Sequence, residues 1–275
     1  MASAPIILDS VTHLLGEHRG RVCYCASHGG RYAGSYAAQS GVGAVILNDA
    51  GIGREQAGIA GLGVLERLGV PAAAVSHRSA RIGDGRDGLA RGVLSFVNAP
   101  AAALGLAAGM ACRTALERLC AAPLTPAPMP PVEREARFED AAAGRGDVRV
   151  VVMDSISLVT AGETGHIIVA ASHGGLLGGR AETAVKYPVF AAVTCDADRG
   201  IDDAGISRLP AMDARGIAGA CVSAFSARIG DGRSVYEDGY ISVVNETARQ
   251  HGGRIGQSCR EFVAAMLTAA DRRGS

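Results

Sequence analysis

The sequence predicts two α/β domains in tandem, and three observations lead to this fold class. The octapeptide Ser-Ala-Arg-Ile-Gly-Asp-Gly-Arg occurs twice, at residues 79–86 and 226–233. In both halves short apolar runs alternate with helical segments, an order typical of mixed sheets whose strands are mostly parallel. A length of 275 residues with 48% hydrophobic content suits two domains of ordinary size. We therefore expect a tandem duplication whose halves are related by a pseudo-twofold axis.

Local patterns predict the elements of the first half. An apolar run, a polar turn and a second apolar run favour an antiparallel hairpin at the start, and glycine or asparagine marks the later element ends. In order, we expect a hairpin over 6–27, a helix over 31–39, a strand over 42–47, a helix over 55–68, strands over 71–75 and 93–97, and a helix from 98 to about 119.

A change of composition separates the halves. Five of the ten prolines lie within residues 123–131, and a charged Ala- and Gly-rich run continues to about residue 147. Such a stretch is typical of a linker. The predicted organisation is a first repeat over 1–122, a linker over 123–147 and a second repeat over 148–275.

The second half repeats the polar turns of the first. Residues 171–175 match 26–30 at an offset of 145, whereas 195–197 match 48–50 at an offset of 147. The second copy therefore has two additional residues between these turns. Lys186, the single lysine among 27 basic residues, lies in that window.

Composition argues against several classes of protein. A formal charge of zero and 4% aromatic residues do not suit a nucleic-acid partner. The start of the chain has no pattern of a signal peptide, and no apolar run is long enough to span a membrane. Seven irregularly spaced cysteines suggest reduced, buried thiols. We expect a cytoplasmic protein without membrane, metal or cofactor, and homo-oligomerisation stays open.

Three polar turns follow predicted strands and are expected to meet at one edge of a sheet, where open α/β folds place ligands. One of them contains Ser172, His173, Gly174 and Gly175, and His28 recurs in the first copy. The histidine could act as a general base beside backbone donors. Alternatively, the glycines shape a tight turn and the histidine only holds it.

The second turn contains Cys195 and Asp196. The thiol could be a nucleophile if His173 or Lys186 lowers its pKa, and Asp196 could move a proton. The first copy has Asn48 in place of Cys195, so the fold does not require a thiol there. A small buried residue that happens to be cysteine is the alternative.

The octapeptide is the third turn. Arg228 and Arg233 offer two guanidinium groups for a carboxylate or phosphate, with Asp231 between them. Arg81 and Arg86 are the first-copy counterparts of the two arginines. In the alternative interpretation, Asp231 pairs with one of these arginines and the two loops form an interface.

Residues that differ between the copies favour a site dominated by the second repeat, in a cleft between the repeats. Tyr236 adds a hydrogen-bonding group there. Asn245, which matches Asn98 of the first copy, is a further candidate, although it also suits an ordinary helix cap. P-loop, dinucleotide and nucleophile-elbow motifs are absent. We expect a hydrolase of a C–N or ester bond in a polar, anionic substrate, such as a cyclic amide. The alternative is a non-catalytic anion-binding or assembly protein in which the paired octapeptide loops form a clamp.

Overall fold

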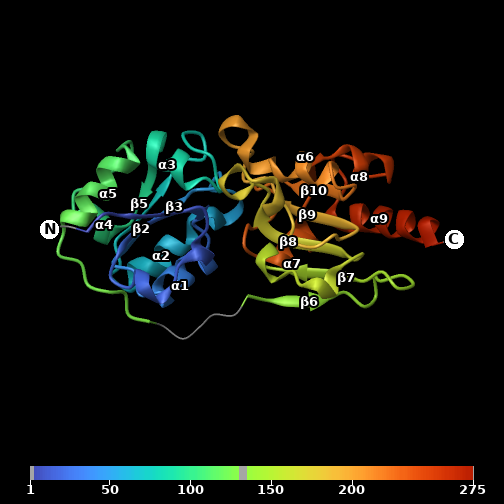
Figure 1. Cartoon of the computed structure of the whole chain (residues 1–275), viewed down its shortest axis with the longest axis horizontal. Coiled ribbons are helices and arrows are strands. Elements are labelled where there is room, and N and C mark those ends of the chain that lie inside the picture. The colour runs from blue at the N-terminus through green and yellow to red at the C-terminus, as the bar shows by residue number, and fades with distance from the viewer. Residues whose placement is uncertain (1–2, 130–134, 275) are drawn as a thin grey trace. The chain divides into compact units, whose positions relative to one another are not determined.

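A computed structural model describes residues 3–129 and 135–274 (Figure 1). Contacts divide the chain into two compact units. The first comprises Met1–Arg134, Leu177–Gly179 and Arg199–Ala204, and the second comprises Glu135–Leu176, Arg180–Asp198 and Gly205–Ser275. Each unit contains one mixed, mostly parallel sheet, which confirms the α/β class.

The predicted linker over 123–147 contains structure at both of its ends. Ala127 is buried in the first core and its N–H donates to the Val42 carbonyl at 2.9 Å. Arg137–Glu139 forms strand β6, which pairs antiparallel with β7 (Val150–Met153) in the second sheet. Pro130 and Pro131 lie outside the described residues. Both described ends of this segment therefore belong to a core or a sheet.

The first sheet has the strand order β1-β2-β3-β4-β5. Strands β1 to β4 pair in parallel, and β5 runs antiparallel to β4. The strands are Ile6–Leu8 (β1), Val22–His28 (β2), Ala44–Asn48 (β3), Ala72–Val75 (β4) and Leu94–Val97 (β5).

The predicted antiparallel hairpin at the start is wrong, because β1 pairs in parallel with β2. The apolar residues after β1 form the short 3-10 turn Val11–His13 instead of a strand, and Ser10 caps this turn. Val11 and Leu14 pack into the core from this turn. The chain between β1 and β2 is thus a crossover of about a dozen residues, which is what a parallel pair requires.

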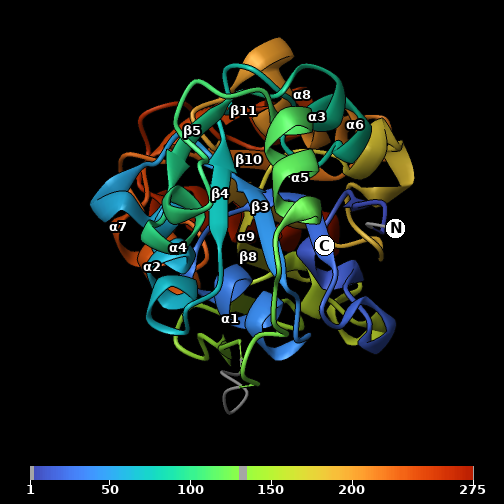
Figure 2. The ribbon, with the colours of Figure 1, turned by 90° about the vertical axis from the view of Figure 1, so that its left-hand side faces the viewer.

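Alternation along the strands gives the first sheet two buried faces. In β2, Cys23 and Cys25 join one hydrophobic cluster, whereas Val22, Tyr24 and Ala26 join the other. Helices α1 (Arg31–Gln39) and α2 (Ala60–Arg67) contribute to the first cluster. Helices α3 (Gly85–Arg91), α4 (Ala99–Ala103) and α5 (Cys112–Ala121) contribute to the second. This unit is therefore a three-layer α/β/α domain, with α1 and α2 below β3 and β4 in Figure 2.

The helix predicted from 98 to about 119 is two helices, α4 and α5. Between them Gly105 and Gly109 have φ angles of 84° and 86°, a left-handed conformation that ends an α-helix. The helix predicted over 55–68 is α2 preceded by the 3-10 segment Arg54–Ile59. The predicted helix over 31–39 coincides with α1.

The second unit has the strand order β11-β10-β9-β8-β7-β6. Strands β7 to β10 are parallel, and β11 pairs antiparallel with β10. The strands not yet bounded are Ile167–His173 (β8), Ala191–Cys195 (β9), Ala218–Val222 (β10) and Ile241–Val244 (β11). The helices are Arg208–Asp213 (α6), Gly232–Asp238 (α7), Glu246–Gln250 (α8) and Cys259–Gly274 (α9).

Equivalent residues make equivalent contacts in the two units. The Asp9 carboxylate accepts the Gly85 N–H at 2.9 Å, and that of Asp154 accepts the Gly232 N–H at 2.8 Å. These bonds tie each octapeptide loop to the end of a neighbouring strand. The two halves thus share this local hydrogen-bonded structure. Their origin by duplication stays an inference from the repeated sequence.

Candidate functional site

In the first unit, polar residues gather at the carboxyl ends of three adjacent parallel strands. His28 at the end of β2 pairs in register with Asn48 at the end of β3, and Asn48 pairs with Val75 at the end of β4. Asp49 follows β3 directly, and His77 is the second residue after β4. Adjacent strands lie about 4.8 Å apart, so these turns share one edge of the sheet.

A buried aspartate–histidine pair lies at this edge. Asp49 Oδ1 is 2.7 Å from His77 Nδ1, and the two residues are 2% and 7% exposed. Burial raises the pKa of the Asp49 carboxyl, but the hydrogen bonds from His77 outweigh this effect and hold the pKa below its ordinary value. An ionised carboxylate only accepts, so His77 Nδ1 carries the proton and Nε2 is the basic nitrogen of the ring.

The second unit contains the same turn without the histidine. Asp196 Oδ1 accepts the N–H groups of Asp198 at 3.0 Å and Ala224 at 2.8 Å, as Asp49 Oδ1 accepts those of Gly51 and His77. Burial raises the pKa of Asp196, and its hydrogen bonds do not reverse that shift. The backbone architecture therefore needs only the aspartate. His77, at the position of Ala224, is an addition that the turn does not require.

One further feature sets the Asp49 turn apart. Asn48 is fully buried, and its Nδ2 has no hydrogen-bond partner among the described residues, a cost of about 1–3 kcal/mol. The four residues after Asp49 have positive φ angles between 47° and 78°, but the equivalent residues 197–200 of the second unit do too, with φ between 49° and 67°. This strained backbone therefore belongs to the turn in both units and does not distinguish the first.

His28 and His173 have the opposite tautomer to His77. Their Nδ1 atoms accept the N–H groups of Gly30 at 3.2 Å and of Gly175 at 3.1 Å, respectively. A neutral ring that accepts at Nδ1 carries its proton on Nε2 and is a donor there. Burial lowers the pKa of His28 to about 4, so this ring is neutral at pH 7. Each histidine thus accepts a backbone N–H of its own Gly-Gly turn.

The other residues predicted to be catalytic are not arranged as a nucleophile and base. Cys195 is fully buried, and burial raises the pKa of its thiol far above the usual range, which disfavours a thiolate nucleophile. Ser172 Oγ accepts the Ile156 N–H at 2.9 Å. Lys186 is exposed, with its Nζ 5.3 Å from the centre of the Tyr187 ring.

The octapeptide arginines of the second unit are paired with nearby acids. Arg228 binds Asp231 Oδ2 through Nε and Nη2 at 3.0 and 2.9 Å, while Asp231 Oδ1 caps α7. Arg233 pairs with Glu237 at 3.0 Å and lies 4.8 Å from the Phe138 ring. These contacts match the alternative interpretation, in which aspartate pins the loop. In the first unit Arg81 and Arg86 are exposed, and Arg81 pairs with Asp202 at 2.9 Å.

Asn245 and Tyr236 also have structural partners. The Asn245 amide bonds four backbone groups, namely the N–H groups of Gly219 and Ala248 and the carbonyls of Ile217 and Leu209. Its hydrogen-bonding capacity is therefore used by the backbone, which suits the alternative of an ordinary helix cap. Tyr236 is 2% exposed and donates to Asp140 at 2.9 Å. Gly174 is buried, and its N–H donates to the Cys195 carbonyl at 2.7 Å.

Arg208 is a buried cation that the sequence patterns did not reveal. It is 3% exposed and donates to the carbonyls of His173, Thr183 and Ala184. Burial lowers its pKa to about 10. The first copy has Gly61 at this position, so a comparison of the two copies could have identified it.

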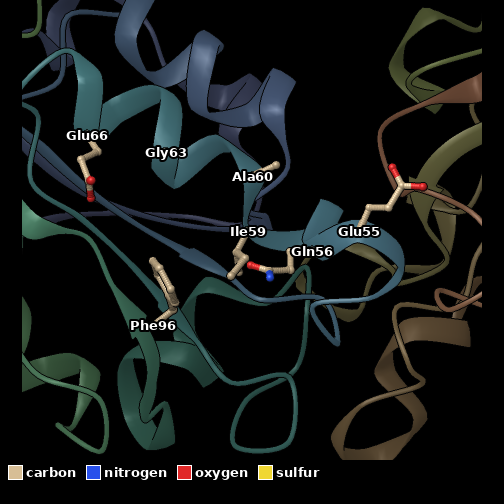
Figure 3. A pocket seen from close by; sticks show the side chains of 7 residues that line it. All are labelled: Glu55, Gln56, Ile59, Ala60, Gly63, Glu66 and Phe96. Atoms are coloured by element: carbon tan, nitrogen blue, oxygen red, sulfur yellow. The ribbon is translucent and has the colours of Figure 1, made fainter.

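A hollow of about 330 Å³ lies on the first unit beside α2 (Figure 3). Gln56, Ile59 and Phe96 lie near its centre, whereas Glu66 and Glu55 lie at opposite ends. The Glu66 carboxylate accepts the Ala99 N–H at 2.9 Å, which gives it a structural role. The described residues that line this hollow do not include the aspartate–histidine pair.

Comparisons with known proteins give no relative. No family model, curated protein or solved structure matches the chain. Within residues 3–129 and 135–274, no helix is long and apolar enough to cross a membrane. The same residues contain no group of three or more metal-ligating side chains suited to an ion.

Proposed function

We propose that the chain is a hydrolase of a C–N or ester bond in a small polar substrate, and that His77 is its general base. The buried Asp49–His77 pair supports this proposal. A carboxylate on Nδ1 fixes the ring and stabilises its protonated form, an arrangement found in hydrolases that activate water or a hydroxyl group. The pair also lies at the carboxyl edge of a parallel sheet, where such folds bind ligands.

In the proposed reaction, His77 Nε2 takes a proton from water as the water oxygen attacks the substrate carbonyl carbon. The carbonyl oxygen becomes an oxyanion, for which the unpartnered Asn48 Nδ2 is a candidate donor. When the oxyanion collapses, the C–N or C–O bond breaks. The protonated His77 then gives its proton to the leaving nitrogen or oxygen. Asp49 keeps its negative charge throughout.

The proposed site differs from the one expected in the cleft between the repeats. The second copy has alanine where the first has His77, and its own titratable candidates hold turns or are buried. The anionic nature of the substrate was inferred from the octapeptide arginines. Because Arg228, Arg233 and Arg81 are each paired with an acid, the expectation of an anionic substrate now rests on Arg86.

The test is hydrolysis of a panel of carboxylate-bearing esters, linear amides and cyclic amides, followed by titration of the acid released. His77→Asn keeps a donor near Asp49 but removes the basic nitrogen. We expect it to lower kcat by about 10²–10⁴-fold, the usual contribution of a general base. Melting temperature measured on the same sample separates lost chemistry from lost folding.

The matched control is Asp196→Asn in the second unit, at the turn that lacks a histidine. It should leave kcat unchanged within about twofold. If His77→Asn retains full activity on a substrate that the wild type hydrolyses, His77 is not the base. If both variants lose activity in parallel with their melting temperature, the two turns are purely structural.

We also propose a reducing, cytoplasmic location for the protein. None of its seven cysteines forms a disulfide, and six of them are buried. Such cysteine usage is typical of compartments in which thiols stay reduced.

A further inference from the structure

A second hollow, far along the chain from the aspartate–histidine pair, lies between the end of α8 and the last turns of α9. Its volume is about 590 Å³, within the range of small-molecule sites. We call it the α8–α9 groove. Its lining residues are Arg249, Gln250, His251, Gly252, Arg254, Gln257, Ala265, Thr268, Ala269 and Arg272.

The groove is strongly basic. Arg249, Arg254 and Arg272 reach it from three segments, and no described lining residue is acidic. The acids nearest in sequence to these arginines are Glu246, which pairs with Arg249 at 2.5 Å, Glu261, which interacts electrostatically with Arg254, and Asp271 beside Arg272. The groups that face the groove are therefore mainly donors. Each guanidinium presents a planar fork that matches two oxygens of a phosphate.

The local structure positions these groups before any ligand arrives. The Arg254 backbone N–H donates to Gln257 Oε1 at 2.7 Å, which closes the turn that carries Arg254. The His251 ring stacks on Phe190, with ring centres 5.7 Å apart. Ala265 and Ala269, one helical turn apart on α9, give the groove a small apolar surface.

We propose that the α8–α9 groove binds a phosphate-bearing small molecule, with Arg254 and Arg272 on the phosphate and the alanine surface under its uncharged part. Arg249 remains shared with Glu246. A phosphate dianion fits better than a single carboxylate, because two guanidinium groups can each bind two of its oxygens. This proposal is independent of the proposed hydrolase.

The test is isothermal titration calorimetry of the full-length protein with pyrophosphate at 50 mM NaCl. We expect one site per chain. Arg254→Gln and Arg272→Gln should each weaken binding at least tenfold, and raising the salt to 500 mM should weaken it further because charged contacts are screened. Both arginines are exposed, so the variants should fold normally. Inorganic phosphate and a phosphate monoester, as further probes, distinguish recognition of the anion from recognition of its organic part.

The control is Arg145→Gln, which removes the same charge from an exposed position outside the groove. It should bind pyrophosphate like the wild type. Binding that is absent up to 1 mM, or that falls equally in all three variants, would overturn the proposal. So would binding that the groove variants leave unchanged, because the anion would then occupy another surface.

Discussion

His28 and His77 show how one hydrogen bond decides what a histidine can do. His28 accepts a backbone N–H at Nδ1, whereas His77 donates to a carboxylate from the same atom. The first arrangement favours a neutral ring that holds a turn, and the second favours a base. Two histidines at the same edge of the same sheet therefore have different chemical properties.

The depressed pKa of His28 predicts how stability depends on pH. In the unfolded chain a histidine has a pKa near 6.5, whereas burial lowers that of His28 to about 4. Between these values the unfolded state binds more protons, so acid favours unfolding. From pH 7 to pH 5 this residue should remove on the order of 1–2 kcal/mol from the free energy of unfolding.

Urea denaturation at both pH values measures this effect, with His28→Gln as the comparison. The variant lacks the titrating ring and should lose less stability between pH 7 and pH 5 than the wild type does. Equal losses in the two proteins would mean that His28 does not contribute to the pH dependence.

His77 was not predicted because only its contact with Asp49, which follows the neighbouring strand, indicates a chemical role. The histidine comes 28 residues after Asp49, and no motif marks it. A signal was nevertheless present, since the two copies align Asp49 with Asp196 but His77 with Ala224. The differences singled out from the sequence were at Cys195, Lys186 and Tyr236, and only the contacts showed that the difference at His77 brings an acid and a base together.

At the scale of elements, two glycines decide how closely α1 and α2 approach. A Cβ atom on Gly34 would lie 2.4 Å from the Gly61 carbonyl oxygen, and one on Gly61 would lie 2.3 Å from that of Gly30. Backbone atoms cannot move aside as a flexible side chain can. These glycines therefore allow a helix contact that any side chain would block.

Gly34→Ala should lower the free energy of unfolding by about 1–3 kcal/mol, the usual cost of overpacking. Gly63→Ala on α2 is the matched control, because its Cβ would meet only the end of the Arg67 side chain, at 3.8 Å. There alanine should stabilise the helix by up to about 1 kcal/mol. Chemical denaturation of both variants measures the difference, and equal destabilisation would contradict the packing argument.

Elements with one strong local signal were predicted well. The strand before the octapeptide and helix α1 have the expected places, because a short apolar run and a glycine boundary each specify local structure. The prediction of an opening hairpin was wrong because its second apolar run can be buried either in a turn or in a strand. Val11 and Leu14 are buried from a 3-10 turn as well as they could be from a strand, so periodicity could not decide the direction of pairing.

At the scale of the whole molecule, the reactivity of the seven cysteines tests whether the cores bury these side chains. Cys23, Cys25, Cys112, Cys195, Cys221 and Cys259 are buried, and Cys120 is half-buried. Burial raises the pKa of each of these thiols, for example that of Cys23 to about 12. Thiolates are the reactive form, so the folded protein should react slowly.

With a thiol-specific chromogenic disulfide at pH 8, about one equivalent should be released from the native protein. All seven thiols should react in 6 M guanidinium chloride. A rapid first equivalent that disappears in a Cys195→Ser variant would contradict the burial of that thiol and restore it as a candidate nucleophile.

The sequence by itself determined the α/β class and the presence of two equivalent turn systems, because alternation of apolar residues and repeated glycines are local properties. It also favoured the residues that differ between the copies as candidates for the chemistry. The tertiary structure decided which polar groups meet. A hydrogen bond from the Gly175 N–H, two residues away, made His173 a turn residue, whereas a contact across strands made His77 the partner of a carboxylate. The proton position on each ring depends on that partner, which only the folded structure identifies.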